Sequence, residues 1–285
     1  MNYQTFAPPE SLKPFIKHFW SLTSDIDNVE VSPLAFRENE CPGVILTKPG
    51  NNIGNSITTL RAFPDGCPGV MMVQSETALC TNENKKLPEI FLHGQTTTTA
   101  ELNYSGRISA IGINFQPYAL QSIFGINANE LTNTGIDIAA VQAKKSINLC
   151  EQLANEETVE GRIKMLSNYL LYQHQHNNIQ TDEVVKYAVA QILQGKGTLP
   201  LKELHQKLQL SERSLERKFN QAIGISPKLF SRICRFQESF KQLQAGSYDK
   251  LSDIAYENEY SDQSYFIRAF KEFTGFSPLE FKKQL

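Results

Sequence analysis

The sequence predicts an α+β protein, in which a β-rich N-terminal domain precedes an all-α domain with two helix-turn-helix units. The first observation is an internal repeat, because segment 211–230 matches segment 262–281 at an offset of 51 residues. The identical positions pair Arg217 with Arg268, Phe219 with Phe270, Gly224 with Gly275, Ser226 with Ser277, Pro227 with Pro278 and Phe230 with Phe281. The second observation is that apolar runs before residue 135 are short and lie between turn residues. A length of 285 residues fits two domains.

Residues 1–135 are expected to form a β-rich barrel or sandwich that serves as a sensor or dimerisation domain. The pattern predicts a short helix over 10–22 and another over 117–125, the second running from a proline to a glycine. His93, beside Gly94, could line a pocket, but we interpret it as a structural histidine. Strands are expected at 44–46, 70–73, 90–92 and 108–115.

A helical segment and a linker are expected over 136–180. The polar run 174–181 is the expected linker, and we interpret His174 and His176 as exposed linker residues. Thr181 is the expected cap of a helix over 182–195, and this helix opens the last domain, residues 181–285.

The first helix-turn-helix unit is expected at about 199–227. Leucines at helical spacing form its first helix, and Ser211 is the expected N-cap of its second. Leu215 and Phe219 lie four residues apart and are expected to face the core. The second helix then turns Arg213, Glu216, Arg217 and Asn220 outward.

The second unit is expected at about 251–278. Its turn should include Glu259 and Tyr260, and Ser261 or Asp262 should cap the helix that follows. The side chains that this helix can present are Gln263, Ser264, Ile267 and Arg268. An α-helix fits the major groove of double-stranded DNA and meets base edges with its N-terminal half, so both outward sets are candidates for reading DNA.

Segment 231–246 is expected to be a helix that connects the two units. It carries an apolar stripe, and a helix of about 15 residues is roughly 22 Å long. Such a connector would fix the separation of two helices that must enter successive major grooves, which lie about 34 Å apart. The apolar stripe consists of Ile233, Phe236, Phe240 and Leu243.

The distribution of charge agrees in sign with a DNA-binding C-terminal domain. The net charge is −2, yet residues 199–285 contain 14 Lys and Arg against 11 Asp and Glu. The remaining residues carry 14 basic and 19 acidic side chains.

Residues 199–285 resemble the DNA-binding domain of the AraC/XylS family of bacterial transcription regulators. The resemblance rests on LSERSLERKFNQAIGISP, RICRFQESF and IAYENEYSDQSYFIRAFKEFTGFSPLEF. It implies a tandem helix-turn-helix fold and base-reading roles for Arg213, Glu216, Arg217, Gln263, Ser264, Ile267 and Arg268. The family usually has glycine where this chain has Glu259, and a small residue where it has His205. Segments 63–66, 91–95 and 115–126 resemble the family's β-rich sensor domains.

Several classes of function are not supported by the sequence. We find no nucleophile elbow, phosphate-binding loop, dinucleotide fingerprint or zinc-protease helix, so we expect no enzyme, no cofactor and no metal. No apolar run is long enough for a membrane span, and we expect no secretory signal. An odd number of cysteines, five, favours the reducing bacterial cytoplasm.

The sequence therefore predicts a DNA-binding transcription regulator that responds to a small-molecule effector through its N-terminal domain. Two alternatives stay open: an N-terminal domain that only mediates protein interaction, and a thiol or metal stress sensor built on Cys41, Cys67 and Cys80. A homodimer and a contact with RNA polymerase, as in an activator, are compatible with this function. The effector, the operator, the oligomeric state and the choice between activation and repression do not follow from the sequence.

Overall fold

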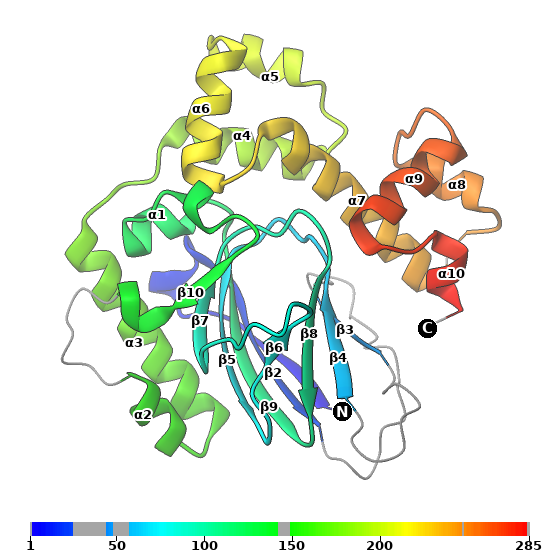
Figure 1. The fold of residues 1–285 in the computed structure, drawn as a ribbon. Helices are drawn as coiled ribbons and strands as arrows, with labels where there is room; N and C mark the ends of the chain where they lie inside the picture. Colours follow the sequence, from blue (N-terminus) through cyan, green and yellow to red (C-terminus); the bar gives the residue numbers. More distant parts are fainter. Residues whose placement is uncertain (1, 25–43, 48–56, 142–148, 247, 284–285) are drawn as a thin grey trace.

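The computed structural model describes residues 2–24, 44–47, 57–141, 149–246 and 248–283, with backbone alone for 44–47. Two β-sheets lie face to face, and the C-terminal helices are arranged around one end of them (Figure 1). The predicted order, β-rich domain first and helical domain second, is confirmed.

The larger sheet has six strands in the order β1-β2-β9-β5-β7-β10, and the smaller has four in the order β3-β4-β8-β6. All pairings between these strands are antiparallel. Side chains such as Leu22, Leu60 and Leu102 fill the space between the sheets. The strands are β1 (Asn2–Phe6), β2 (Ile16–Ser24), β3 (Val44–Thr47), β4 (Ile57–Ala62), β5 (Gly69–Ser75), β6 (Cys80–Thr81), β7 (Ile90–His93), β8 (Ala100–Ser105), β9 (Ile108–Phe115) and β10 (Gly135–Asp137).

Helices cover the other face of the six-stranded sheet. Leu166 and Leu170 share one buried cluster with Val70, Leu92 and Ile113 of the strands. The helical segment therefore packs on the β-sandwich, and its first two helices, over 119–124 and 128–131, also contact the C-terminal helix 212–223. Its elements are α1 (Ala119–Phe124), the 3-10 helices η3 (Ala128–Leu131) and η4 (Ile138–Val141), α2 (Leu149–Asn155) and α3 (Val159–Asn177).

The C-terminal domain consists of α4 (Glu183–Gln194), α5 (Leu201–Leu208), α6 (Glu212–Ile223), α7 (Pro227–Ala245), α8 (Leu251–Glu257), α9 (Gln263–Thr274) and α10 (Pro278–Lys282). Its core combines aromatic and aliphatic side chains, and the predicted stripe of the connector is buried within it. One residue of the sandwich, Phe63, joins this core and contacts the rings of Phe240 and Phe281, with centroids 5.5 and 5.9 Å apart. The two domains thus share apolar packing.

The helix predicted over 10–22 is wrong. A 3-10 helix, η1 (Glu10–Leu12), is followed directly by strand β2. This strand is covered on both faces: Phe19 packs toward the helices, and Trp20 and Leu22 pack between the sheets. A strand buried on both faces loses the alternation of polar and apolar residues, so it resembles a helix in sequence.

The linker expected at 174–181 begins later, because α3 continues to Asn177. His174 is half-buried: its Nδ1 lies 3.0 Å from the carbonyl of Ser122, and its ring packs on Phe15. The cap of α4 is Asp182, whose Oδ1 accepts from the N–H of Val184 at 2.9 Å. The hydroxyl of Thr181, the residue expected as cap, pairs instead with that of Ser122.

Candidate nucleic-acid interface

Helix α6 forms at the position that the sequence predicts for the first recognition helix. Ser211 caps it, with Oγ accepting from the N–H of Ser214 at 3.3 Å, and Leu215 and Phe219 are fully buried. Packing of these two side chains fixes which face of the helix points outward. Arg213, Glu216 and Arg217 are exposed on that face, whereas Asn220 is half-buried near its end.

Helix α9 repeats this arrangement. Asp262 is the cap, and its Oδ1 accepts from the N–H of Tyr265 at 2.8 Å. This hydrogen bond, more than any other contact, holds the pKa of Asp262 below its usual value. Gln263, Ser264 and Arg268 are exposed. Ile267 is half-buried and packs against the aromatic core, so it lies at the edge of the outward face.

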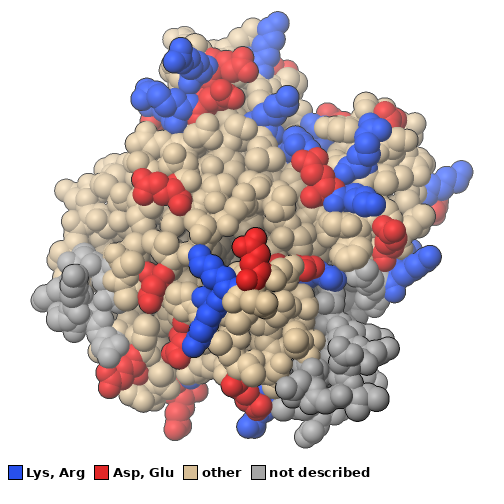
Figure 2. Space-filling view, viewed as in Figure 1, with Lys and Arg blue, Asp and Glu red and all other residues tan. Residues whose placement is uncertain are grey.

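The charges of the two units are mixed in sign. Figure 2 shows basic and acidic side chains interspersed over both units and few charges on the middle of the same face. Several cations are paired, as in Lys218 with Asp182 and Arg232 with Glu272. Within the described residues, no ion pair involves Arg213, Arg217 or Arg268. These three arginines therefore carry charges on α6 and α9 that no described ion pair balances.

Both units turn through a left-handed residue that is not glycine. Gln209 has φ of +52° and Glu259 has φ of +54°. Glu259 is the residue that stands where the resemblance leads us to expect glycine, and its side chain is exposed beside the second recognition helix. The turn thus keeps the geometry that glycine favours, at a cost in backbone strain.

Arg235 of the connector α7 links both units, and no pattern in the sequence singles it out. Its Nη1 donates to the carbonyl of Glu259 at 3.3 Å, and its Nη2 donates to the carbonyl of Gly197 at 3.1 Å. Gly197 precedes α5 and Glu259 lies in the turn before α9, so one guanidinium contacts both units. The same guanidinium carbon lies 5.7 Å from the ring centroid of Tyr260.

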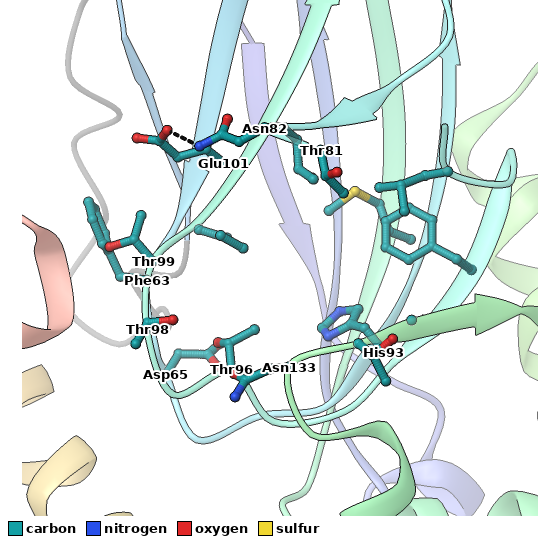
Figure 3. A pocket seen from close by; sticks show the side chains of 18 of the residues that line it. Phe63, Asp65, Thr81, Asn82, His93, Thr96, Thr98, Thr99, Glu101 and Asn133 are labelled. Atoms are coloured by element: carbon teal, nitrogen blue, oxygen red, sulfur yellow. Dashed lines mark hydrogen bonds between the residues drawn. The ribbon is translucent and has the colours of Figure 1, made fainter. Parts of the chain in front are cut away.

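A cavity of about 450 Å³ lies between the two sheets (Figure 3). Apolar lining comes from Trp20, Met71 and Phe91, and polar lining from threonine and asparagine side chains. His93 points into the cavity, so its interpretation as a purely structural residue is wrong. Gly69 is the residue in the sequence that could have indicated the position of His93. A Cβ atom at Gly69 would lie 2.7 Å from His93 Nε2, so any larger residue there would collide with the ring.

Five charged or titratable side chains, Asp65, Glu83, Lys85, His93 and Glu101, are among those that line the cavity, and the pKa values of His93 and Glu101 are shifted. Burial lowers the pKa of His93 and outweighs the opposite effect of its hydrogen bond to Gly94, so the ring is neutral at pH 7. Hydrogen bonds from Asn82 and Arg61 lower the pKa of Glu101 and keep it ionised. Arg61 Nε donates to Glu101 Oε1 at 2.6 Å, so this charge is balanced within the wall.

The cysteines named for a thiol or metal sensor do not gather in the described structure. Cys41 lies outside the described residues. Cys67 is buried and accepts from Lys17 Nζ at 2.9 Å, whereas Cys80 is half-buried and contacts the carbonyl of Ala78. Among the residues described, no cluster of His, Cys, Asp or Glu could hold a metal ion, and no helix is long and apolar enough to span a membrane.

Two separate segments of the chain match known families. Residues 204–284 match a family described as a helix-turn-helix domain, and residues 51–137 match a domain of unknown function, DUF6597. The chain is 30% identical over 103 residues to YisR of Bacillus subtilis (strain 168), named an uncharacterized HTH-type transcriptional regulator. That match covers 35% of this chain and 36% of the relative, so it spans about a third of the relative's length.

Three solved structures are also similar. ToxT from Vibrio cholerae has a TM-score of 0.45 and 14% identity, and the match covers 81% of this chain and 98% of that one. Unsaturated fatty acid-bound wild-type ToxT from Vibrio cholerae strain SCE256 has a TM-score of 0.43 and 14% identity, and the match covers 88% of this chain and 98% of that one. The C-terminal domain of AraT, a response regulator from Geobacillus stearothermophilus, has a TM-score of 0.35 and 25% identity, and the match covers 38% of this chain and 89% of that one. Because these TM-scores lie below 0.5, nothing further is concluded from them. The family match confirms a helix-turn-helix domain of AraC type at the C-terminus.

Proposed function

We propose, since the C-terminal part of this chain belongs to the AraC-type helix-turn-helix domains, that the protein regulates transcription by binding double-stranded DNA through both units. The observation that carries the proposal is that the same capped, amphipathic helix occurs twice, as α6 and as α9. In each unit a capped helix buries two side chains four residues apart and exposes a polar N-terminal half. Both of these helices pack against the single helix α7.

We assign base reading to the exposed side chains of these halves. Arginine can donate two hydrogen bonds to guanine, and Gln263 can pair with adenine in the same way. Glu216 can accept from cytosine, although it also repels phosphate. The full set is Arg213, Glu216, Arg217, Asn220, Gln263, Ser264, Ile267 and Arg268. Asn220 and Ile267, which are half-buried, contribute at the edges.

The proposal is tested with the full chain and a library of random DNA duplexes. We expect selection to enrich one asymmetric site that contains two half-sites about one helical turn apart. Affinity for that site should fall steeply as salt rises, because phosphate contacts release counterions. Enrichment of no sequence above the library background would refute sequence-specific binding.

We further propose that the cavity of the N-terminal domain is the effector site. Its volume of about 450 Å³ lies in the usual range for small-molecule pockets. The wall combines aromatic rings with hydroxyl and amide groups, and its neutral His93 offers a hydrogen-bond acceptor at Nε2. The charge of Glu101 is already balanced by Arg61. The aromatic rings and the neutral histidine favour a molecule with a flat apolar body and a hydrogen-bond donor, and Asp65, Glu83 and Lys85 also line the cavity.

Direct binding measurements test the effector site. A panel of uncharged aromatic alcohols and amides is added to the full chain, and binding is followed by calorimetry. The Met71→Trp variant fills the cavity from the wall and should abolish binding of any member that binds the wild-type chain. Undiminished binding to the Met71→Trp variant would place the ligand elsewhere. An N-terminal domain that serves protein interaction alone would bind no member of the panel.

We also propose that the chain is divided into three parts, 1–135, 136–180 and 181–285. We propose that the protein acts in the bacterial cytoplasm. The packing of α3 on the six-stranded sheet supports treating the first two ranges as one sensor unit. Homodimerisation and contact with RNA polymerase are proposed as routes from DNA binding to activation. Sizing of the full chain with and without selected DNA tests the first of these.

A further inference from the structure

The N-terminal domain holds both recognition helices by their C-terminal ends. Thr132 Oγ1 donates to the carbonyl of Gly224, the C-cap of α6, at 2.7 Å. Thr99 Oγ1 donates to the carbonyl of Phe273, in the last turn of α9, at 2.8 Å. Carbonyl groups at the C-terminal end of a helix lack partners within the helix, so each hydroxyl supplies a missing donor. The N-terminal halves of both helices stay exposed.

These two threonines belong to one connected piece of structure, residues 94–99 and 132–134, which we call the platform. Asn133 joins its two segments: its Oδ1 accepts from the N–H of Thr97 at 2.8 Å, and its own N–H donates to the carbonyl of Gln95 at 2.8 Å. Asn133 Nδ2 also donates to Thr97 Oγ1 at 2.8 Å. A shift of one segment is therefore transmitted to the other.

The fit between the platform and α6 is close. A Cβ atom on Gly224 would lie 2.7 Å from Thr132 Oγ1 and 2.8 Å from the carbonyl oxygen of Ala128. Distances this short are below normal van der Waals contact. The end of α6 thus cannot move toward the platform without displacing the platform. Close packing of this kind transmits a displacement of one segment to the other.

The platform is also one wall of the cavity. Figure 3 shows Thr96, Thr98, Thr99 and Asn133 together on one side of it, and Thr134 belongs to the same lining. Trp20 and Met71 line it from the six-stranded sheet. Any molecule that fills the cavity must contact the piece of structure that holds both recognition helices.

We propose that the platform couples occupancy of the cavity to the position of both recognition helices at once. This inference rests on the proposed function, because it takes the two helices as the DNA-reading elements. An occupant that displaces the platform moves the ends of both α6 and α9, and unequal movement of the two ends changes the spacing at which the two units meet the major grooves. Coupling between two sites is reciprocal in free energy, so DNA that fixes the spacing must also act on the cavity.

Trp20 reports this reciprocal effect without a known effector. It is the one tryptophan among 285 residues, and it lines the cavity. The full chain is titrated with the DNA duplex enriched by selection, and binding is followed by anisotropy of labelled DNA. Tryptophan emission and its quenching by acrylamide are measured in parallel. We expect a shift in emission and a changed quenching constant that both saturate with DNA binding.

Two variants assign the response to the platform. In Thr99→Val with Thr132→Val, both hydroxyl groups are removed at nearly constant volume, and the tryptophan response should be lost while DNA still binds. Thr198→Val is the matched control, because Thr198 Oγ1 donates to the carbonyl of Gly195 at 2.9 Å, at a helix end away from the platform. This control should keep the full response.

The outcomes are distinct. A wild-type chain that binds selected DNA with no change at Trp20 overturns the coupling, as does a response that survives in the double variant. A chain that binds no selected DNA, seen in the anisotropy itself, overturns the proposed function. If the double variant fails to fold by circular dichroism, hydrogen exchange of residues 94–99 in the wild-type chain decides the question. DNA should change their protection, and unchanged protection overturns the coupling.

Discussion

Replacement of Glu259 by glycine is expected to stabilise the second helix-turn-helix unit. Glu259 has φ of +54°, and this left-handed conformation costs a residue with a side chain about 1–2 kcal/mol. Its N–H donates to the carbonyl of Tyr256 and its carbonyl accepts from Arg235, and glycine retains both backbone groups. The side chain is exposed, so its removal sacrifices no core packing.

The gain in the free energy of unfolding is smaller than the strain energy that is relieved, because glycine is also more flexible in the unfolded chain. That flexibility costs roughly 0.5–1 kcal/mol relative to alanine. The free energy of unfolding of the Glu259→Gly variant should therefore rise by about 0.5–1 kcal/mol. A domain has roughly 5–15 kcal/mol of stability in total, so this change is measurable.

Urea unfolding of the full chain, followed by circular dichroism, measures the effect. Gln209→Gly is the matched control, because Gln209 occupies the turn of the first unit with φ of +52° and carries no charge. Glu259→Gln is the complementary control, since it keeps the strain and removes the charge. We expect both glycine variants to gain stability and the glutamine variant to gain none. A Glu259→Gly chain that is no more stable than the wild type, beside a stabilised Gln209→Gly chain, would refute the reasoning.

The same variants separate strain from charge in DNA binding. Both Glu259→Gly and Glu259→Gln remove a negative charge beside the second recognition helix, so both should bind DNA more tightly at low salt. The gain should fade as salt rises, because exposed charges are screened. An affinity gain confined to the glycine variant would assign the effect to the turn geometry instead.

Three further predictions concern the DNA contacts, the connector and the start of α4. Arg217→Ala should weaken binding to the selected site by about 1–3 kcal/mol and spare random DNA; an equal loss on both, measured by anisotropy, would identify a phosphate contact. Phe240→Ala, at a fully buried site, should lower the free energy of unfolding by about 3–5 kcal/mol in urea, and a loss below 1 kcal/mol would contradict that burial. Burial would raise the pKa of Asp182, but hydrogen bonds from Lys218 and the Val184 N–H outweigh it and lower that pKa. The wild-type chain should therefore be more stable than Asp182→Asn above pH 4, and the difference should vanish as the pH falls through the lowered pKa; a difference independent of pH would show that the charge contributes nothing.

The C-terminal domain could be predicted from the sequence because its signals are local and occur twice. Capping residues, apolar pairs four residues apart and a glycine after each recognition helix all lie within 20 residues of one another. The structure places α6 and α9 where those signals indicate. The base-reading role of their exposed residues stays a prediction.

The features that escaped sequence analysis depend on contacts between distant segments. The sequence of strand β2 predicted a helix because the residues that cover both faces of this strand come from elsewhere in the chain. His93 became a cavity residue because Gly69, on a neighbouring strand, leaves space for its ring. Arg235 makes its two hydrogen bonds to residues 38 and 24 positions away. No periodicity along the chain encodes such contacts.

Two equivalent glycines show how docking on the sandwich distinguishes the duplicated units. Gly224 and Gly275 both end a recognition helix, with φ of +93° and +80°, so the left-handed turn alone accounts for glycine at each. At Gly275 a Cβ atom would meet nothing within 4 Å among the described residues, whereas at Gly224 it would collide with Thr132 and Ala128. Both units accept a hydrogen bond from a threonine hydroxyl, Thr132 at Gly224 and Thr99 at Phe273. The first unit in addition abuts the platform with its backbone, while the second contacts the ring of Phe63. Because only the first contact adds a close backbone approach to its hydrogen bond, we expect a displaced platform to shift the two helices by unequal amounts. Unequal shifts change the spacing between the units, which is the quantity that a site with two half-sites detects.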